Sequence, residues 1–518
     1  MALLWKPPTE VSKAEERILA KCKKSKLFVF LRRHRHELFD ESFQRELASM
    51  YPERARGKEP VPPALLAMVT LLQAALGISD EEAVEYAALE RRWQMLLDCL
   101  DDEDAPFSQG SLFNFRQRLI GADLDRRLLE RTVELARRTK AFGARALRAA
   151  FDASPLFGAG RVEDTFNLIG HAAREVLSSV AKRLDVTLAE AATRAGIPLL
   201  NGTSLKAALD VDWDDAAAKK AALERLLQQV RALEAFVERE LSAETQRPPL
   251  STQLATLRQV VGQDIEPDPE GSGVRLKDGV AKERRISVRD GQMRHGRKSK
   301  TSRVDGYKRH IALDLDDKLI LAVAVTPANR PEAEATDDLL ADVRRHGDTV
   351  EELHIDRGYL PAPAIATERA AGVRIRCKPF PLRNAGRFTK ADFALDLLAQ
   401  RITCPEGQSV PLQLGHVARF PSIVCAACPS RSRCTTAAKA GRSLSIHAAE
   451  PLLLELRQAR AEPAGRAALR ERTFVEHGLA AVSRSQGRKA RYLGVRKNLF
   501  DVRRHAAVAN LHTAARAA

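Results

Sequence analysis

Residues 147–165, LRAAFDASPLFGAGRVEDT, decide the fold of this 518-residue chain. Apolar residues occupy every second position from Leu147 to Phe151, which is the period of a half-buried strand. Pro155 cannot donate a ladder hydrogen bond, so we expect the strand to end there. Asp152 would then lie at the carboxyl end of a strand, where a catalytic carboxylate is well held.

Strand patterns return after residue 300. GYKRHIALDLDDKLILAVAVTP (306–327) predicts a hairpin that turns at Asp316–Asp317. VEELHIDRGYL (350–360) predicts another strand, and Gly358 is expected to let the backbone turn sharply just past Asp356. A second carboxylate is therefore predicted at a strand end.

The remaining elements complete the sheet. Residues 161–260 are almost wholly helix-patterned, and DIEPDPEGSG (264–273) predicts a breaker-rich linker. Further elements are predicted as helices at 332–345 and 362–371 and a strand at 373–379. The order of strand, hairpin, helix, strand, helix and strand predicts a mixed α/β sheet with a helical insertion after its first strand.

The N-terminal part predicts a compact helical domain that ends near residue 140. ALLAMVTLLQAALG (64–77) is a strong apolar helix, closed by Gly77. Ser79 is predicted to cap the next helix, SDEEAVEYAALERRW, with Glu82 completing a capping box.

The third helix of this domain, SLFNFRQRL, is expected to be capped by Ser111. A structural bundle and a DNA-reading domain would both explain the three helices. Arg116 and Arg118 make the third helix basic, which favours the DNA-reading domain.

The charge favours a polyanionic partner. The net charge is +16 and the pI is about 9.7, and Lys and Arg gain affinity by releasing phosphate counterions. A scattered, solvated basic surface is the alternative. Residues 284–310 hold ten Lys/Arg against two Asp, and residues 484–504 hold eight against one. This clustering favours nucleic acid.

A third carboxylate joins the two aspartates. AGRAALRERTFVEHGLAAVSR (464–484) predicts one long helix with Arg472 and Glu476 on the same face. Asp152, Asp356 and Glu476 suit Mg²⁺, a hard ion that takes few protein ligands and leaves positions for water and phosphate oxygens. Two such ions can clamp the attacking and leaving oxygens of a phosphoryl transfer.

These motifs resemble those of bacterial insertion-sequence transposases of the DDE type. FDASPLFGAGRVEDT is similar to their first acidic motif, HIDRGY to the second, and RTFVEH to the third. The flanking HGRKSKTSRVDGYKRHIALD and RYLGVRKN also match, as do the N-terminal PPALLAMVTLLQAALGISDEEAVEYAALERRW and FSQGSLFNFRQRL. The resemblance covers roughly residues 60–512. Each motif alone is weak, but together and in order they are strong.

The resemblance implies an RNase H-like catalytic core that cuts and joins DNA at the ends of its element. It implies Asp152, Asp356 and Glu476 as ligands of two Mg²⁺ (or Mn²⁺) ions, and Arg472 as a phosphate-binding residue. The site would free a 3′-OH and then activate it to attack target DNA. The partners would be the terminal inverted repeats and the target DNA. A homodimer or higher synaptic complex is expected, because two ends must be held together.

The chain departs from the family pattern at two positions. Related transposases often place a Tyr three residues before the Arg and a Lys seven residues after the Glu, where this chain has Leu469 and Ser483. The residues expected to take over that grip on the DNA end are Arg484, Arg488 and Lys489. The other candidates for binding phosphates are Arg297, Lys298, Lys300 and Arg357.

Two other classes of protein remain open. One is a catalytically silent DNA-binding protein derived from a transposase, and the intact carboxylate set argues against it. The other is a structure-specific nuclease, which the sequence separates poorly because hydrolysis and strand transfer use one site. Beside Asp356, His354 and Tyr359 are interpreted as structural residues. Trp213 is interpreted as a packing residue rather than one that stacks on a displaced base.

Four of the seven cysteines lie within residues 404–434. Cys404, Cys425, Cys428 and Cys434 form the pattern C-x20-C-x2-C-x5-C, and four thiolates on Zn²⁺ make a closed structural site. Unpaired thiols in a variable loop and disulfides remain open as alternatives. The other three cysteines are expected to behave as small apolar residues; they are Cys22, Cys99 and Cys377.

The composition points away from membranes. The sequence has no run of eighteen apolar residues, and MALLWKPPTEVSKAEE lacks a basic region followed by an apolar core, so we expect no membrane span and no secretory signal. A bacterial cytoplasmic, nucleoid-associated protein is expected.

The expected parts are an N-terminal helical domain that binds DNA ends (1–140), a catalytic core (141–160 and 274–380), a helical insertion (161–273), a cysteine-rich, zinc-binding insertion (381–450) and a C-terminal helical part of the core (451–518).

Overall fold

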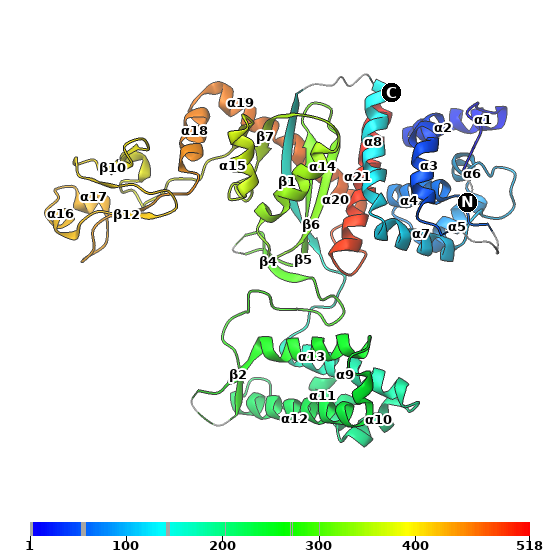
Figure 1. Cartoon of the computed structure of the whole chain (residues 1–518), viewed down its shortest axis with the longest axis horizontal. Coiled ribbons are helices and arrows are strands. Elements are labelled where there is room, and N and C mark those ends of the chain that lie inside the picture. Colours follow the sequence, from blue (N-terminus) through cyan, green and yellow to red (C-terminus); the bar gives the residue numbers. More distant parts are fainter. Residues whose placement is uncertain are drawn as a thin grey trace.

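The structure is a computed structural model that describes residues 4–52, 59–140, 146–202, 204–269, 271, 273–299 and 301–517. A mixed six-stranded sheet lies at its centre, with helices packed on it (Figure 1). The strand order is β4-β5-β1-β7-β8, and β6 also pairs with β5. The strands are β1 (Leu147–Phe157), β4 (Arg294–Arg297), β5 (Arg303–Asp314), β6 (Ile320–Pro327), β7 (Val350–Ile355) and β8 (Arg374–Cys377). The predicted mixed α/β class is confirmed.

Strand β1 runs straight through Pro155, so the prediction that the proline ends it is wrong. β1 pairs with β5 in antiparallel fashion as far as Phe157, but with β7 only from Leu147 to Ala150. The amide of Phe157, two residues beyond the proline, points away from β5 to the carbonyl of Arg488. Because alternate residues point the same way, the missing N–H of Pro155 faces the side that β7 has already left. Asp152 therefore lies within β1 rather than at its end.

The hairpin and the two helices between β6 and β8 follow the sequence pattern. β5 and β6 are joined by the predicted turn, and the following helix begins with a 3₁₀ turn. The helices of the core are η3 (Glu332–Ala335), α14 (Thr336–Arg344), α15 (Pro363–Ala370), α18 (Glu450–Ala461), α19 (Pro463–Glu471), α20 (Thr473–Gln486) and α21 (Val495–Ala517).

One long helix was predicted for residues 464–484, and the structure breaks it in two. Arg472 is both the C-cap residue of α19 and the N-cap residue of α20. Glu476 consequently lies in the first turn of α20. Val475 and Val482 of α20 are fully buried, whereas Phe474 remains 41% exposed.

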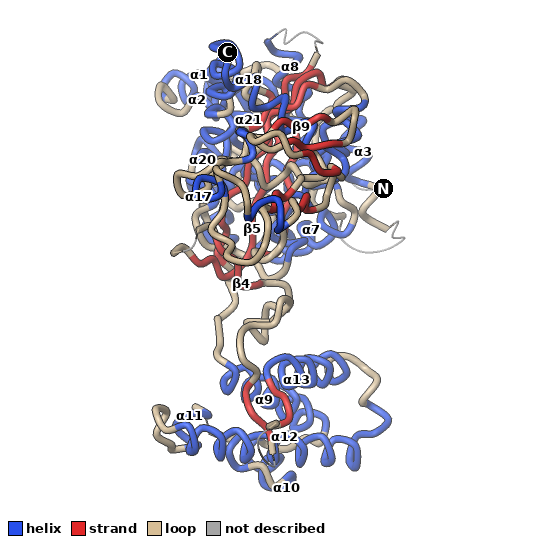
Figure 2. Tube along the Cα trace, turned by 90° about the vertical axis from the view of Figure 1, so that its left-hand side faces the viewer, coloured by secondary structure: helices blue, strands red, loops and turns tan. Residues whose placement is uncertain are grey.

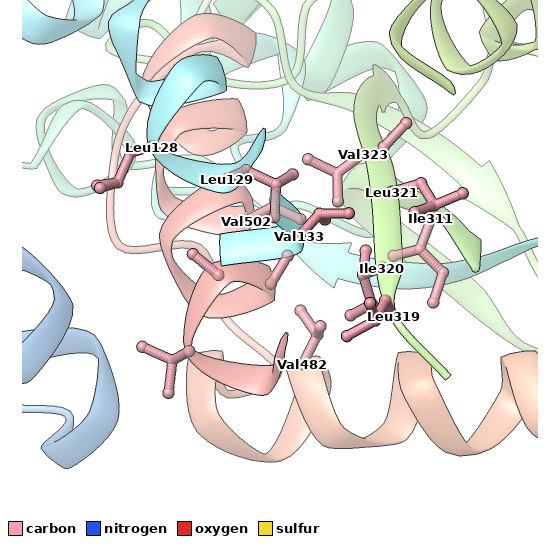
Figure 3. Packing of buried hydrophobic residues seen from close by; sticks show 14 of the residues in the cluster. Leu128, Leu129, Val133, Ile311, Leu319, Ile320, Leu321, Val323, Val482 and Val502 are labelled. Atoms are coloured by element: carbon pink, nitrogen blue, oxygen red, sulfur yellow. The ribbon is translucent and has the colours of Figure 1, made fainter. Parts of the chain in front are cut away.

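Helix α21 connects the sheet to the N-terminal helices. Figure 3 shows Val502 of α21 beside Leu129 and Val133 of α8, facing Ile320 and its neighbours on β6. The N-terminal helices and the sheet thus share one hydrophobic core. Those helices are α1 (Lys13–Lys21), α2 (Lys26–Leu38), α3 (Glu41–Ala48), α4 (Pro63–Leu76), α5 (Asp80–Leu89), α6 (Arg91–Leu97), α7 (Gln109–Gly121) and α8 (Leu124–Lys140).

Local signals in this N-terminal part are largely confirmed. Gly77 ends α4 in the left-handed conformation with φ of 73°, and Ser79 forms the predicted capping box with Glu82. The predicted second helix is split, because Glu90 ends α5 and caps α6. The cap of α7 is Ser108 rather than Ser111, whose amide donates to the Ser108 hydroxyl.

The two arginines of α7 are structural, which corrects the argument that they favour DNA. Arg116 is 7% exposed and binds both carboxylate oxygens of Asp80. Arg118 lies over the ring of Tyr51, 4.5 Å from its centroid. Their charges are used inside the helical domain.

No single helix among the described residues is long and apolar enough to cross a membrane. Helices α4 and α5 reach that composition only when taken together, and they meet at a bend of 105°. Helix α4 is buried along nearly its whole length by other elements of the protein.

The helices between β1 and β4 have a hydrophobic core of their own. Figure 2 shows them joined to the sheet by two extended segments. The predicted linker at 264–273 instead contributes to a small hairpin of β2 (Ile265–Pro267) and β3 (Val274–Leu276). Trp213 packs edge-on against Phe166, as predicted. The helices are α9 (Thr165–Arg183), α10 (Leu188–Ala195), η1 (Pro198–Leu200), α11 (Leu205–Leu209), α12 (Ala216–Leu241), η2 (Ser242–Glu244) and α13 (Leu250–Asp264).

The cysteine-rich segment forms short strands and helices of its own. It has a third, small hydrophobic cluster that includes Phe393, Ile402 and Phe420. It lies beyond α18, away from the sheet (Figure 1). Its elements are η4 (Lys390–Asp392), β9 (Ala394–Asp396), β10 (Arg401–Thr403), β11 (Ser409–Pro411), β12 (Val417–Arg419), α16 (Ser422–Ala426), α17 (Arg431–Cys434) and β13 (Ser443–Ser445).

Candidate active site

The register between β1 and β7 brings the two aspartates together. Ala150 of β1 pairs with His354 of β7 in parallel register. Asp152 lies two residues after Ala150, and Asp356 lies two residues after His354. Their Cα atoms are therefore at the same level of the sheet, on the neighbouring segments β1 and the end of β7. Two carboxylates 204 positions apart in the sequence are thus neighbours.

Arg472 joins these aspartates to the third carboxylate. Its Nη2 lies 2.7 Å from Oδ1 of Asp152 and 3.8 Å from Oδ2 of Asp356, and its Nη1 lies 3.5 Å from Oε1 of Glu476. The side chain of Asp152 is only 15% exposed, whereas those of Asp356 and Glu476 are 51% and 56% exposed. One fixed and two solvent-facing carboxylates therefore surround a single guanidinium.

These groups line an open cavity of about 600 Å³. Basic side chains from β4, its following loop and β5 contribute to the same wall. Ser483, one of the two positions at which the chain departs from the motif pattern that it resembles, also lines it. The cavity is formed by residues that include Asp152, Ser154, Arg297, Lys298, Lys308, Glu332, Asp356, Arg472, Glu476 and Ser483.

The pKa of the Asp152 carboxyl group is raised above its ordinary value. Burial raises the pKa of its carboxyl group, the guanidinium of Arg472 opposes that rise, and the charges of Asp356 and Glu476 add to it. The amide of Ala153 donates a hydrogen bond of 2.9 Å to Oδ1. Additional positive charge in the cavity would favour the ionised form of this group.

Buried polar side chains hold the elements of the site in place. Arg309 of β5 donates to the hydroxyl of Ser154 on β1 (2.8 Å) and to the side chain of Gln486 at the end of α20 (2.6 Å). Beneath Asp356, the hydroxyl of Tyr359 is hydrogen-bonded to Nδ1 of His310 at 2.8 Å. Tyr359 is fully buried, which agrees with its predicted packing role.

The backbone turns just past Asp356, as predicted, and the amide of Tyr359 donates to the carbonyl of Asp356 at 3.0 Å, but Gly358 has a different role in the turn. Its φ angle is not among the positive values of the chain, so glycine is not required for the turn itself. A Cβ atom added there would overlap Oε2 of Glu332 and lie 2.8 Å from its Cδ. The glycine makes room for a carboxylate.

The candidate DNA-binding residues fall into three groups. Arg297 and Lys298 are exposed and line the cavity, while Lys300 lies outside the described residues. Arg357 does not line the cavity; its Nε donates to the carbonyl of Lys378. The third group lies at and after the end of α20, where all three side chains are exposed, and consists of Arg484, Arg488 and Lys489.

The clustered charge in the sequence overstates the basic surface. Arg309 is buried within the core. Arg496 and Arg503 bind Asp123 and Asp125 at the start of α8. These arginines support the fold, and the exposed basic residues around the cavity are a smaller set.

His354 is a structural residue, as predicted. Its ring is fully buried, and Nε2 lies 2.6 Å from Oε1 of Glu352. Glu352 also accepts a hydrogen bond from Arg376 at 3.1 Å. His354 does not line the cavity.

The sequence reasoning missed Glu332 and Lys308, which both line the cavity. Lys308 lies on β5, and its Nζ donates to the carbonyl of Arg330 at 2.7 Å. Glu332 follows β6 in η3. Its position shortly after a buried strand was the available signal, although Asp356 follows β7 directly and Glu332 begins the 3₁₀ turn after β6.

Four cysteines, Cys404, Cys425, Cys428 and Cys434, line one cavity of about 250 Å³. All four are free thiols. The amides of Gln408 and Arg442 approach the sulfurs of Cys404 and Cys425 at 3.4 and 3.5 Å. Across the described part of the chain, however, neither these thiols nor the carboxylates form a group already spaced to hold a metal ion. The remaining three cysteines are buried, as predicted.

Comparisons with known families agree with this arrangement. A model described as "Transposase domain (DUF772)" matches residues 19–118, and two models described as "Transposase DDE domain" match residues 273–375 and 403–514. No curated protein and no solved structure matches the chain. The matches define a transposase-class protein. Within that class, the chain belongs to the DDE transposases.

The matched ranges contain two of the three carboxylates. Asp356 lies within residues 273–375, and Arg472 and Glu476 lie within residues 403–514. Asp152 and the helices α9–α13 lie outside all three matched ranges. The placement of Asp152 therefore depends on the geometry of the sheet.

Proposed function

We propose that this transposase binds the ends of its insertion sequence and catalyses metal-dependent cleavage and strand transfer there. The observation that carries the proposal is the convergence of Asp152, Asp356 and Glu476 on Arg472 in one open cavity with basic walls. Family membership supplies the reaction class, because transposases act on DNA.

We propose an RNase H-like core for the sheet. Three antiparallel strands, β6, β5 and β1, are followed by β7 and β8 in parallel to β1. The predicted domain boundaries are proposed with it, including an N-terminal part that binds DNA ends, the helical insertion at 161–273 and the cysteine-rich insertion at 381–450.

The carboxylate set fits a pair of Mg²⁺ or Mn²⁺ ions. Its donors are hard oxygens, two of the three side chains face solvent, and the three share one cation in the described structure. Asp152, Asp356 and Glu476 would hold the ions. When bound, such ions activate the attacking oxygen and stabilise the charge on the leaving oxygen.

The surrounding residues position DNA. Arg472 would turn from the carboxylates toward a phosphate, since its planar guanidinium suits phosphate oxygens. Arg297, Lys298 and Lys300 would follow the backbone on one side of the cavity. Arg484, Arg488 and Lys489 would do so beyond α20, and Arg357 would offer its two Nη groups to phosphate while its Nε donates to the Lys378 carbonyl. Two DNA ends require at least a homodimer.

We also propose a structural zinc site at the four cysteines. Free thiols from the residue after β10, from α16 and the residues after it, and from α17 line one cavity, and amide N–H groups approach two of the sulfurs. Such N–H groups stabilise thiolates. The segment has only a small hydrophobic cluster, so four thiolates on zinc would contribute directly to its folding.

The test is cleavage of a DNA fragment that carries the element's own end, with Mg²⁺, by the wild type and by Asp356→Asn. Loss of cleavage with DNA binding retained supports the proposal. The matched control is Glu351→Gln, an exposed carboxylate on β7, which should cleave like the wild type. Equal cleavage by Asp356→Asn removes that residue from the site. Tight end binding without cleavage by the wild type would indicate a silent DNA-binding protein, and cleavage without joining would indicate a nuclease.

A further inference from the structure

Glu332 is the one carboxylate of the cavity that the three acidic motifs leave unassigned. It lies in η3, the first turn after β6, and it lines the same cavity as Asp152, Asp356 and Glu476. It reaches this position from a fourth segment of the chain, 24 residues before Asp356.

The carboxylate of Glu332 packs against the backbone of Gly358 at the edge of the cavity. Its Oε2 lies directly against the backbone of Gly358, two residues after Asp356, where any Cβ would overlap it. Glycine leaves room for the carboxylate in this position, and the backbone conformation does not require it. The loop after Asp356 is therefore shaped around Glu332.

The carboxylate has no donor of its own among the described residues. No described side chain or amide forms a hydrogen bond or an ion pair with it, although it is only partly exposed. The nearest cation on its side, Lys308, gives its ammonium to the carbonyl of Arg330. Burial raises the pKa of Glu332 and the charge of Lys308 opposes that rise, while the charges of Asp356 and Asp152 add to it.

A half-buried acid without a partner, beside two other acids, is destabilising unless a cation shares the space. Arg472 carries a single charge and already serves three carboxylates, and Lys308 adds one further positive charge on the side of Glu332. Two positive charges therefore face four carboxylates. A divalent ion would supply the missing charge.

We propose that Glu332 is a fourth carboxylate of the metal centre, bound to the ion directly or through one of its waters. The inference rests on the proposed function, because it requires Asp152 and Asp356 to bind a divalent ion. It adds a residue that none of the acidic motifs contains.

The experiment is a titration of the full-length chain with Mn²⁺. Binding is monitored by the loss of the free-ion signal in electron paramagnetic resonance. The variants are Glu332→Gln and Asp152→Asn, and the control is Glu334→Gln, an exposed carboxylate in the same turn. Glutamine has nearly the volume of glutamate, so Glu332→Gln should fold, and circular dichroism checks this. We expect Mn²⁺ affinity to fall by about tenfold or more in Glu332→Gln, to fall in Asp152→Asn, and to stay unchanged in Glu334→Gln.

The outcomes separate the inference from the proposed function. If Asp152→Asn binds Mn²⁺ weakly but Glu332→Gln binds it like the wild type, the inference is overturned and the proposed function stands. If Glu332→Gln binds Mn²⁺ normally but no longer cleaves DNA, the inference is also overturned. Glu332 would then support cleavage in some way other than by binding the ion. If wild type and Asp152→Asn bind equally, both the proposed function and the inference fail.

Discussion

Nη2 of Arg472 lies 2.7 Å from Oδ1 of Asp152, across 320 residues of sequence. The same nitrogen is 3.8 Å from Asp356, so the two aspartates share one positive charge. Nε of Arg472 is buried without a hydrogen-bond partner among the described residues. Arg472 therefore holds the carboxylates together, and its Nε–H group makes no hydrogen bond to a described residue in this arrangement.

Replacing Arg472 should make the site depend on metal for its stability. In Arg472→Ala we expect the metal-free protein to lose about 2 kcal/mol, since hydrogen bonds to charged groups are worth roughly that much. Because the carboxylates then repel one another, Mg²⁺ should raise the melting temperature more than it does in the wild type. Scanning calorimetry with and without Mg²⁺ measures both effects.

Arg470→Ala is the matched control, because Arg470 is exposed on the same helix end. It should change neither quantity. A Mg²⁺ response of Arg472→Ala equal to that of the wild type would show that the guanidinium does not compete with the ion.

Arg309 should be a stabilising residue whose loss loosens the site. It is buried and connects Ser154 on β1 with Gln486 and the carbonyl of Gly487 after α20. Arg309→Met keeps much of the volume but leaves these acceptors unpaired. We expect a loss of about 3 kcal/mol in unfolding free energy, measured by urea denaturation.

The comparison for Arg309 is Arg303→Met on the same strand. Arg303 is mostly exposed and pairs with Asp305 at 3.1 Å, and exposed pairs contribute about 0–1 kcal/mol. Equal losses in the two variants would contradict the role given to burial.

Local signals in the sequence were sufficient for the elements. Alternating apolar residues predicted β1 and the β5–β6 hairpin, and Gly77 and Ser79 marked real helix ends. These features depend on residues within a few positions of one another, so one sequence contains them. The class of fold followed from the same signals, whereas the three acidic motifs were identified through the resemblance to a known family.

Features that depend on long-range contacts were missed. Pro155 is tolerated within β1 because β7 stops pairing at Ala150, which local pattern cannot show. Arg116 is basic in the sequence but is neutralised by Asp80, 36 residues away. Glu332 enters the site only because β6 and the loop after β7 meet in space. Charge counts and motif spacing do not include such partners.

Zinc should be measurable in the purified chain if the cysteines bind it. We expect about one Zn²⁺ per chain in the wild type and a strong loss in Cys428→Ser, because a structural site needs its four ligands. Chelation should open the cysteine-rich segment to protease while the sheet stays resistant, as detected by mass spectrometry of the fragments. Cys22→Ala, which alters a buried cysteine of the N-terminal helices, should keep its zinc. A wild type without zinc, or one whose protease pattern ignores chelation, would favour unpaired thiols.

Glu352 should make the core sensitive to acid. Burial alone would raise its pKa, but the hydrogen bonds from His354 and Arg376 outweigh burial and lower the pKa from 4.5 to about 2. A lowered pKa in the folded state contributes stability that is fully present above pH 4.5 and is lost as the pH falls toward 2. At neutral pH this contribution is roughly 3 kcal/mol.

Glu352→Gln should therefore flatten the fall in unfolding free energy between pH 5 and pH 3, which urea denaturation measures. The control is Glu351→Gln, which alters an exposed residue of the same strand and should keep the wild-type slope. Parallel slopes for Glu352→Gln and the wild type would mean that the His354–Glu352 pair does not stabilise the fold.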